Sequence, residues 1–365
     1  MKYLGTKFDH NSAFRPGILI LNLGSPEAPT KKALRPYLKE FLSDPRIIEL
    51  PRVLWLTILN LFVLNTRPKR SAKLYQNIWT EEGAPLAVFT KRQAEKLQAL
   101  LKERHGIDIP VDFGMRYGKL SIKAGLQRLK DKQVNKILIL PLYPQYSATT
   151  TGSILDGVFA ELKTWRYVPE IRTVNTYHDK PEYITAIADS ITKLWKEKGE
   201  PEKIIFSFHG TPLRYLLNGD PYHCMCLKTA RLVAEKLQLP REKYEVSFQS
   251  IFGREKWIGP YTDETIEKLA QNGIKKLDVI CPGFSVDCLE TVDEIDRESR
   301  HVFMENGGEE FRYIPALNDT DEHIDLISKI VLENTLGWKL ADDKTPEEIK
   351  KMHDLFNQLE ENKVA

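Results

Sequence analysis

A strand followed by a loop and a helix recurs along this chain of 365 residues, and this recurrence restricts the fold more than any other feature. Each strand is a short run of aliphatic and aromatic residues, which is typical of strands buried on both faces of a parallel sheet. Strands that alternate with helices form βαβ units. We expect such units at 17–42, 111–132, 137–162, 171–198, 204–238, 244–271 and 277–305. The chain is therefore predicted to be an α/β protein with two parallel sheets of about four strands each.

A histidine follows one of these strands directly. The strand at 204–208 ends beside His209, and a Gly-Thr-Pro sequence then turns the chain. Ligands of open α/β sheets bind just beyond the carboxyl ends of the strands, so His209 is a candidate for the chemistry of the protein. The alternative is a histidine that only hydrogen-bonds the turn.

A row of carboxylates follows the strand at 277–281. If the next segment is an α-helix, Asp287, Glu290, Glu294 and Glu298 lie on one face of it. The usual explanation of such a row is a solvated helix face. Here no lysine lies on the row to balance its charge, which favours a path for cations. Imidazole combined with carboxylate suits Fe²⁺ and similar transition metals.

An apolar segment at 53–64 is too short to span a bilayer, which needs about twenty residues. It is either a buried core helix or an exposed lip beside an apolar ligand pocket or a membrane surface. The basic residues that follow it, Arg67, Lys69 and Arg70, suit the carboxylates of a ligand or anionic lipid headgroups.

Two further stretches carry polar residues at strand ends. Arg116 and Tyr117 end the strand at 111–118, where the arginine is equally suited to clamp a carboxylate or to form a structural ion pair. The loop at 144–152 has four consecutive positions from Ser147 to Thr150 that are mostly hydroxyl-bearing. This loop is either the start of a helix or the polar lining of a cavity.

Composition and motif searches exclude several classes of function. The net charge of +2 gives no reason to expect nucleic acid as a partner. The chain has no GxGxxG, Walker or GxSxG motif, so nucleotide binding and serine hydrolysis have no support. Because residues 1–17 contain no apolar signal-peptide core, we expect a cytoplasmic protein whose four cysteines do not form structural disulfides.

Several stretches together resemble one enzyme family. They cover roughly residues 17 to 330 in the family's order and read ILILNLGSPEAP, RYG at 116–118, LYPQYSATTTGS, FSFHGTPL, NGDPY, SFQS with GPYTDET, and CPGFSVDCLETVDEI. In these stretches the sequence resembles the ferrochelatases, lyases that act last in haem biosynthesis. The resemblance implies insertion of Fe²⁺ into protoporphyrin IX, which forms protohaem and releases two protons.

The resemblance also implies a domain organisation. It predicts two Rossmann-like domains with a porphyrin cleft between them and a helical extension after the second. The predicted divisions are an N-terminal domain at 17–170 with the apolar lip at 53–64, a C-terminal domain at 171–330 that carries His209 and Glu290, and the extension at 331–365. The sequence Thr345-Pro346-Glu347-Glu348 predicts the start of a last packing helix within this extension.

Site residues carried over from the family fall into two groups. His209 and Glu290 are implied as the pair that handles metal and protons, with Asp287, Glu294 and Glu298 as a relay for the cation. The residues implied on the porphyrin side are Leu23, Arg67, Arg116, Tyr117 and Thr149. The chemistry agrees, because two pyrrole protons must leave before a dication enters, and histidine is a suitable base near neutral pH.

The expected partners are protoporphyrin IX, ferrous iron as a substrate and, through 53–64, the inner face of a membrane. No tightly bound cofactor is expected. Some relatives carry a [2Fe–2S] cluster, and here the ligands would have to be Cys224, Cys226, Cys281 and Cys288. Cys281 and Cys288 fit better as small buried apolar residues. Cys288 also stands where many family members have a histidine, which weakens any assignment of a second imidazole there.

Two alternatives remain open from the sequence. One is a chelatase for another metal, such as cobalt, or for another tetrapyrrole, such as coproporphyrin. The other is a tetrapyrrole carrier without turnover, which would use the same cleft and arginines but would not need the acidic row.

Overall fold

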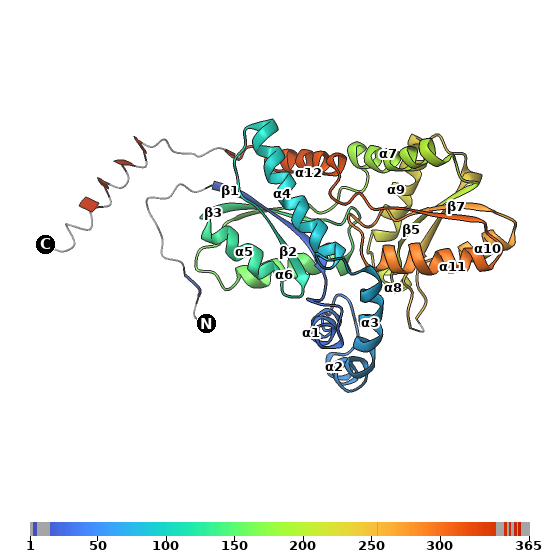
Figure 1. The fold of residues 1–365 in the computed structure, drawn as a ribbon. Coiled ribbons are helices and arrows are strands. Elements are labelled where there is room, and N and C mark those ends of the chain that lie inside the picture. The colour runs from blue at the N-terminus through green and yellow to red at the C-terminus, as the bar shows by residue number, and fades with distance from the viewer. Residues whose placement is uncertain are drawn as a thin grey trace.

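The computed structural model contains two parallel four-stranded sheets that lie side by side (Figure 1). This architecture confirms the predicted α/β fold. The residues described by the structure are 3–5, 15–253, 255–340, 347–348, 350–351, 354–355 and 357–358. Of the apolar residues predicted for the last helix, Ile349, Met352 and Leu359 lie outside this part of the chain.

The first sheet has the strand order β2-β1-β3-β4. Its strands are β1 (Arg15–Gly24), β2 (Val111–Tyr117), β3 (Val134–Pro141) and β4 (Glu170–Thr173). The residues from Ile18 to Leu21 have no exposed surface, because helices cover the central strand β1 on both faces. This double burial explains the unbroken apolar run in the sequence. Since β4 pairs with β3, the first sheet extends past residue 170, and the predicted division of the chain into domains stays a prediction.

The second sheet has the strand order β6-β5-β7-β8. Its strands are β5 (Lys203–His209), β6 (Tyr244–Gln249), β7 (Lys276–Ile280) and β8 (Glu310–Ile314). The sequence did not predict β8, whose central residue is an arginine. Arg312 is nevertheless buried. Its charge is compensated by Asp278 on β7, whose Oδ1 lies 2.6 Å from Nε of Arg312. A buried charge of this kind is tolerated only when it is paired and hydrogen-bonded.

Helices cover both sheets, and one of them connects the two halves of the molecule (Figure 1). Helix α12 packs against both α4 and α7, so the chain returns from the second sheet to the first. The covering helices are α4 (Pro85–His105), α5 (Ile122–Asp131), α6 (Ser153–Leu162), α7 (Pro181–Lys198), α9 (Tyr222–Lys236), α10 (Thr262–Gln271), α11 (Arg300–Glu305) and α12 (Asp321–Asn334), with the short turns α8 (Leu213–Leu217) and η3 (Arg241–Lys243). At this junction, Gln93 Nε2 donates to the carbonyl of Asn318 at 2.7 Å.

The helices between β1 and α4 form a projection below the sheets (Figure 1). They are α1 (Lys31–Leu42), α2 (Arg52–Ile58), the π-helix η1 (Leu59–Val63) and α3 (Leu64–Ile78). Leu59 and Leu64 are buried inside the projection, but the side chains of Val53, Leu54, Leu61 and Phe62 are 56–82% exposed. The segment at 53–64 is therefore an exposed lip, and the alternative of a buried core helix is wrong.

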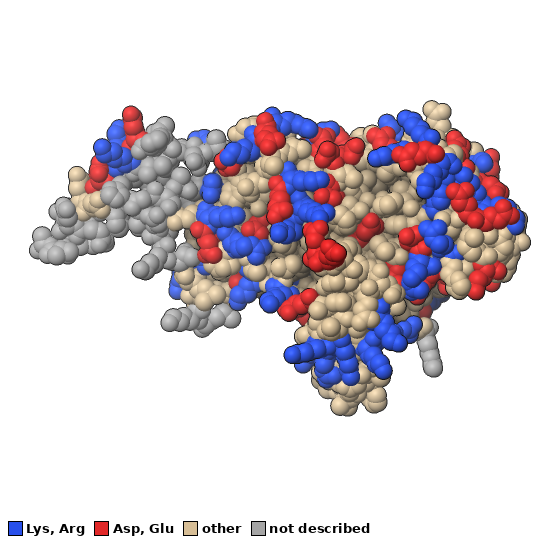
Figure 2. Space-filling view, in the orientation of Figure 1, with Lys and Arg blue, Asp and Glu red and all other residues tan. Residues whose placement is uncertain are grey.

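Charge is unevenly distributed over the projection. Figure 2 shows Lys and Arg side chains gathered on its flanks, while its tip carries none. Arg52, Lys69 and Arg70 are among the exposed residues of this region. Within the described residues, no helix has the length and apolar character that crossing a membrane requires.

Candidate active site

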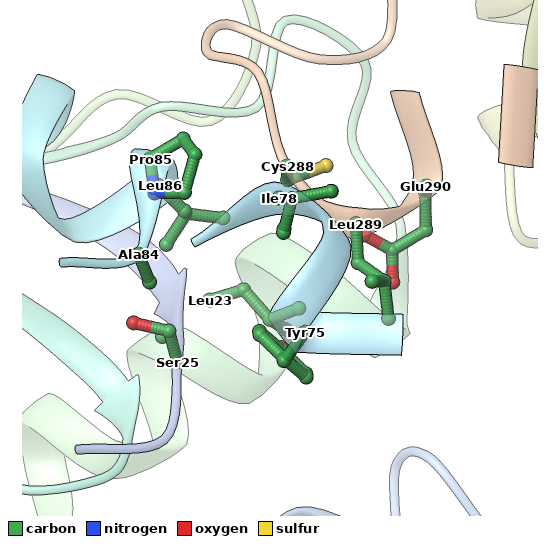
Figure 3. Close-up of a pocket in the computed structure, with 11 residues that line it drawn as sticks. Leu23, Ser25, Tyr75, Ile78, Ala84, Pro85, Leu86, Cys288, Leu289 and Glu290 are labelled. Carbon is green, nitrogen blue, oxygen red and sulfur yellow. The ribbon is translucent and has the colours of Figure 1, made fainter. Parts of the chain in front are cut away.

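A narrow pocket lies where the first sheet and the projection meet the segment that follows β7 (Figure 3). Leu23 from the end of β1, Tyr75 and Ile78 from α3, and Cys288 and Glu290 contribute to its lining. The pocket encloses about 10 Å³, which is the space of one water-sized sphere. Elements from both halves of the molecule thus surround the carboxylate of Glu290.

His209 is the last residue of β5 and is half-buried. Its Nδ1 lies 2.6 Å from the carbonyl oxygen of Gly210. Because a carbonyl can only accept a hydrogen bond, Nδ1 must carry a proton, and the neutral ring then has its lone pair on Nε2. A Cβ at position 210 would lie only 3.0 Å from the carbonyl oxygen of Gln249, so the close approach in the turn after His209 favours glycine. The hydrogen bond to this turn therefore fixes Nε2 as the nitrogen of the neutral ring that is free to accept a proton.

The carboxylates after β7 do not lie on an α-helix. The helix there is a π-helix, η4 (Leu289–Ser299), in which the hydrogen bonds run from residue i to residue i+5. It begins at Leu289, so Asp287 precedes it. The prediction that Asp287, Glu290, Glu294 and Glu298 share one α-helical face is therefore wrong. π-helical segments are rare and often occur at functional sites.

Glu294 lies close to both members of the predicted catalytic pair. The backbone N–H of Ser250 donates to its Oε1 at 2.6 Å, and the Ser250 hydroxyl donates to Oε2 at 2.5 Å. Burial raises the pKa of Glu294, and the negative charge of Glu290 raises it further, while the Ser250 hydrogen bonds and the nearby His209 oppose the shift. The structure thus brings Glu294 within electrostatic reach of both His209 and Glu290.

Asp287 and Glu298 lie in very different surroundings. Asp287 is buried and accepts hydrogen bonds from Tyr313 Oη at 2.6 Å, Asn318 Nδ2 at 2.8 Å and Thr291 Oγ1 at 3.1 Å. Glu298 is exposed and pairs with Arg297 at 2.8 Å. The expectation that no cation balances the row is therefore wrong at Glu298, where the neighbouring arginine supplies the charge.

Arg116 and Tyr117 belong to a buried hydrogen-bond network around Asp44. Oδ2 of Asp44 lies 2.6 Å from Arg116 Nη2 and accepts from Tyr117 Oη at 2.8 Å and from Ser153 Oγ at 2.6 Å. Burial alone would raise the pKa of Asp44, but these hydrogen bonds and the charge of Arg116 hold it below its ordinary value. Of the two alternatives for Arg116, the structure shows the structural ion pair.

Arg67 differs from Arg116 in the groups that surround its charge. Its guanidinium lies 5.7 Å from the ring centroid of Phe252, which belongs to the second half of the molecule. Burial lowers the pKa of Arg67 and the neighbouring Arg70 adds to this effect, while Tyr37 and Glu290 oppose it. Among the described residues Arg67 has no ion-pair partner, so its charge is available to a ligand. Thr149 is the second residue of the π-helix η2 (Ala148–Gly152), and its Oγ1 lies 2.9 Å from Ser147 Oγ.

Three tyrosines near Glu290 were missed by the sequence analysis. Tyr37, Tyr75 and Tyr143 come from three separate elements, so no local pattern identifies them. Burial raises the pKa of each hydroxyl, with a contribution from the charge of Glu290. They are therefore neutral near physiological pH. The hydroxyl of Tyr143 is buried and has no hydrogen-bond partner within the structure.

The four cysteines do not assemble into a cluster site. Cys224 is exposed, whereas Cys226, Cys281 and Cys288 are buried. Among the described residues, which include all four cysteines, no group of three or more His, Cys, Asp or Glu side chains is placed to hold a metal ion. Burial also raises the pKa of the Cys288 thiol, so this residue is a neutral side chain beside Glu290.

Two parallel sheets with an imidazole and carboxylates beyond their strand ends define a chelatase-like α/β protein. Solved structures agree with this fold. The sirohydrochlorin chelatase SirB from Bacillus subtilis subspecies spizizenii, solved with cobalt, superimposes with a TM-score of 0.52 at 11% identity, over 90% of this chain and all of that one. DR2241 from Deinococcus radiodurans gives a TM-score of 0.50 at 10% identity, over 92% of this chain and 57% of that one.

Sequence comparison identifies the family. A family model described as ferrochelatase matches residues 15–335. The chain is 52% identical over 343 residues to the ferrochelatase of Idiomarina loihiensis, with 94% of each chain covered. It is 49% identical over 366 residues to that of Marinobacter nauticus, with 100% of this chain and 98% of the relative covered. The chain belongs to the ferrochelatase family, and it is a lyase that inserts iron into a porphyrin in haem biosynthesis. The alternative of a carrier without turnover is set aside.

Proposed function

We propose that the porphyrin is protoporphyrin IX and that it receives Fe²⁺ beside His209 and Glu290. The observation that carries this proposal is the position of Glu290, which lines a pocket walled by the first half, together with Glu294, which lies within electrostatic reach of both Glu290 and His209. The reaction exchanges two pyrrole protons for one dication, so the site must accept protons and bind a metal transiently.

Each side chain has a role that follows from its surroundings. The Nε2 lone pair of His209 accepts a pyrrole proton, since Nδ1 is occupied by the carbonyl of Gly210. Glu290 offers a carboxylate to the metal and to the second proton. Glu294 and the exposed Glu298 extend the acidic path toward solvent. Asp287 accepts several hydrogen bonds already, so we assign it to anchoring the start of η4 rather than to the path itself.

On the porphyrin side, the unpaired charge of Arg67 suits a propionate group. Leu23 lines the apolar wall of the pocket. We also assign the hydroxyl of Thr149 to the porphyrin side, although Thr149 lies outside the lining of this pocket. Arg116 and Tyr117 act through their fixed network with Asp44, which keeps this wall rigid. A rigid wall allows binding energy from the rest of the ring to distort the macrocycle and expose its nitrogen lone pairs.

The substrate assignment is tested with the purified protein. Under anaerobic conditions with Fe²⁺, we expect metal insertion into protoporphyrin IX, followed by absorbance, to have a kcat/KM at least about tenfold higher than insertion into coproporphyrin III. The same assay with Co²⁺ in place of Fe²⁺ tests which metal the protein prefers to insert. A faster reaction with coproporphyrin would reject protoporphyrin IX as the substrate while leaving the site assignment in place.

We also propose that the lip faces the inner surface of the cytoplasmic membrane. Val53, Leu54, Leu61 and Phe62 are exposed together at the tip of the projection, and cationic residues flank them (Figure 2). An apolar tip beside basic residues suits insertion among anionic headgroups. A lip in this position would receive an apolar porphyrin from the bilayer and return the haem to it.

Replacing Leu54, Leu61 and Phe62 together with Ser should weaken sedimentation with anionic liposomes by at least about tenfold, because each lost side chain removes about 1.5 kcal/mol or more of apolar burial. Thermal stability should change little, since these side chains are exposed. The control is Leu336→Ser, which is 73% exposed and follows α12. That helix lies on the opposite side of the sheets from the projection in Figure 1. Unchanged liposome binding in the triple variant, or an equal loss in the control, would contradict the assignment.

A further inference from the structure

The last residue of β6, Gln249, links the first turn of η4, which carries Glu290, to the strand that carries His209. Its side chain is only 3% exposed. Its Nε2 donates to the backbone carbonyl of Glu290 at 2.7 Å. A buried amide costs free energy unless its hydrogen bonds are satisfied, so this contact defines where the first turn of η4 lies.

The same amide is held from its other side. Ser207 Oγ donates to Gln249 Oε1 at 2.7 Å. The Ser207 proton is thereby used, so Thr262 Oγ1 at 2.8 Å must donate to Ser207, and Ser247 Oγ at 2.9 Å must donate to Thr262. The result is a directed chain of buried hydroxyls that ends at the carbonyl of Glu290. Hydrogen bonds aligned in this way polarise and strengthen one another.

Gln249 is also coupled to His209 through the backbone. The two residues are register partners at the carboxyl ends of β5 and β6. The N–H of Gly210 donates to the carbonyl of Gln249 at 2.8 Å, in the turn whose carbonyl orients the imidazole. The backbone carbonyl of Gln249 therefore accepts a hydrogen bond from the turn after His209, and its side-chain amide donates one to the backbone carbonyl of Glu290.

The next residue adds a second tie to the π-helix. Ser250 has a φ of +64°, a conformation that is costly for a residue other than glycine. This conformation aims both its N–H and its hydroxyl at the carboxylate of Glu294. A strained residue persists where the surrounding contacts require it, and here those contacts hold the second carboxylate of η4.

We propose that Gln249 is a positioning residue for iron insertion, which sets the separation between His209 and Glu290 while touching neither substrate. This inference rests on the proposed roles of His209 and Glu290. Displacement of a reacting group by about 1 Å can cost about 10²-fold in rate, so loss of this tie should appear in catalysis more than in binding.

The test compares Gln249→Met with Ser247→Ala. Methionine has a similar size but cannot donate to the Glu290 carbonyl. Ser247 is a matched control, because it is buried on the same strand and loses one hydrogen bond of the same chain without contacting η4. We expect Gln249→Met to lower kcat by about 10- to 100-fold, with KM for porphyrin and for Fe²⁺ changed by less than about twofold. Ser247→Ala should lose thermal stability and keep its kcat.

The outcomes separate this inference from the proposed function. Unchanged kcat in Gln249→Met, or an equal loss of kcat in Ser247→Ala, would overturn the positioning role while His209 and Glu290 remain the site. Unchanged kcat in His209→Ala and in Glu290→Gln would instead reject the proposed site itself. If Gln249→Met does not fold, Ser207→Ala releases the same amide from its hydroxyl anchor and should show a smaller fall in kcat. An unchanged kcat in that variant would equally reject the inference.

Discussion

Replacement of His209 by alanine should lower kcat for iron insertion by about 10³-fold, because it removes the base that we propose accepts a pyrrole proton. Binding energy from the rest of the porphyrin is untouched, so KM for the porphyrin should change little. The folded structure should survive, since the half-buried ring contributes one hydrogen bond to a strand-end turn, worth about 1 kcal/mol. Steady-state kinetics under anaerobic conditions and a thermal melt measure both quantities.

His223→Ala is the control for this prediction. His223 is also half-buried in the second half of the molecule, where its ring stacks on Phe248 of β6 at 5.3 Å. Its removal deletes an imidazole near the same sheet without entering the proposed site, so kcat should stay within about twofold of the unaltered protein. Activity of His209→Ala close to that of the unaltered protein would reject the assignment of the base.

Glu290→Gln should lower kcat by about 10²-fold even when iron is saturating. The substitution keeps the size of the side chain and removes the charge that would assist metal transfer. Because its carboxylate lines a narrow pocket and is only partly exposed, solvent replaces the lost charge poorly. Measurement of kcat across a range of Fe²⁺ concentrations separates a defect in transfer from a defect in iron binding.

Glu298→Gln is the matched substitution in the same π-helix. Glu298 is exposed and pairs with Arg297, so its role in the path concerns only the approach of the cation. It should raise KM for Fe²⁺, with an effect that disappears as iron is increased. If Glu298→Gln inserts iron as fast as the unaltered protein at low Fe²⁺ concentration, Glu298 is not part of the proposed path. If Glu290→Gln keeps its kcat, Glu290 is not part of the transfer step.

The expected position of His209 shows where sequence reasoning succeeds. An apolar strand followed by histidine and a glycine turn is a local pattern, and strand ends in α/β sheets are where ligands bind. Glu290 was selected differently, from the acidic row and the family resemblance, and it lies ten residues beyond the end of β7. The position of His209 depends on near neighbours in the chain, which leave a local signal in the sequence.

The acidic row and Arg116 show where that reasoning failed. A π-helix has no sequence period of its own that differs clearly from an α-helix, so the row was placed on the wrong kind of helix and Asp287 was included in it. Arg116 forms its ion pair with Asp44, which lies 72 positions away in the chain. An arginine at a strand end has the same local sequence whether it binds a ligand or a buried carboxylate.

The sequence by itself determined the alternation of strands and helices, the two strand-end clusters and the family. The tertiary structure alone decided that the segment at 53–64 is exposed on one side and that Gln249 joins β6 to η4. It also decided that Arg116 is in an ion pair whereas Arg67 has no such partner within the described part of the chain. The physical reason is the distance along the chain over which each effect acts. Burial periodicity and turn chemistry act between residues a few positions apart, whereas the partner of a buried polar group is chosen by chain segments that meet only after folding.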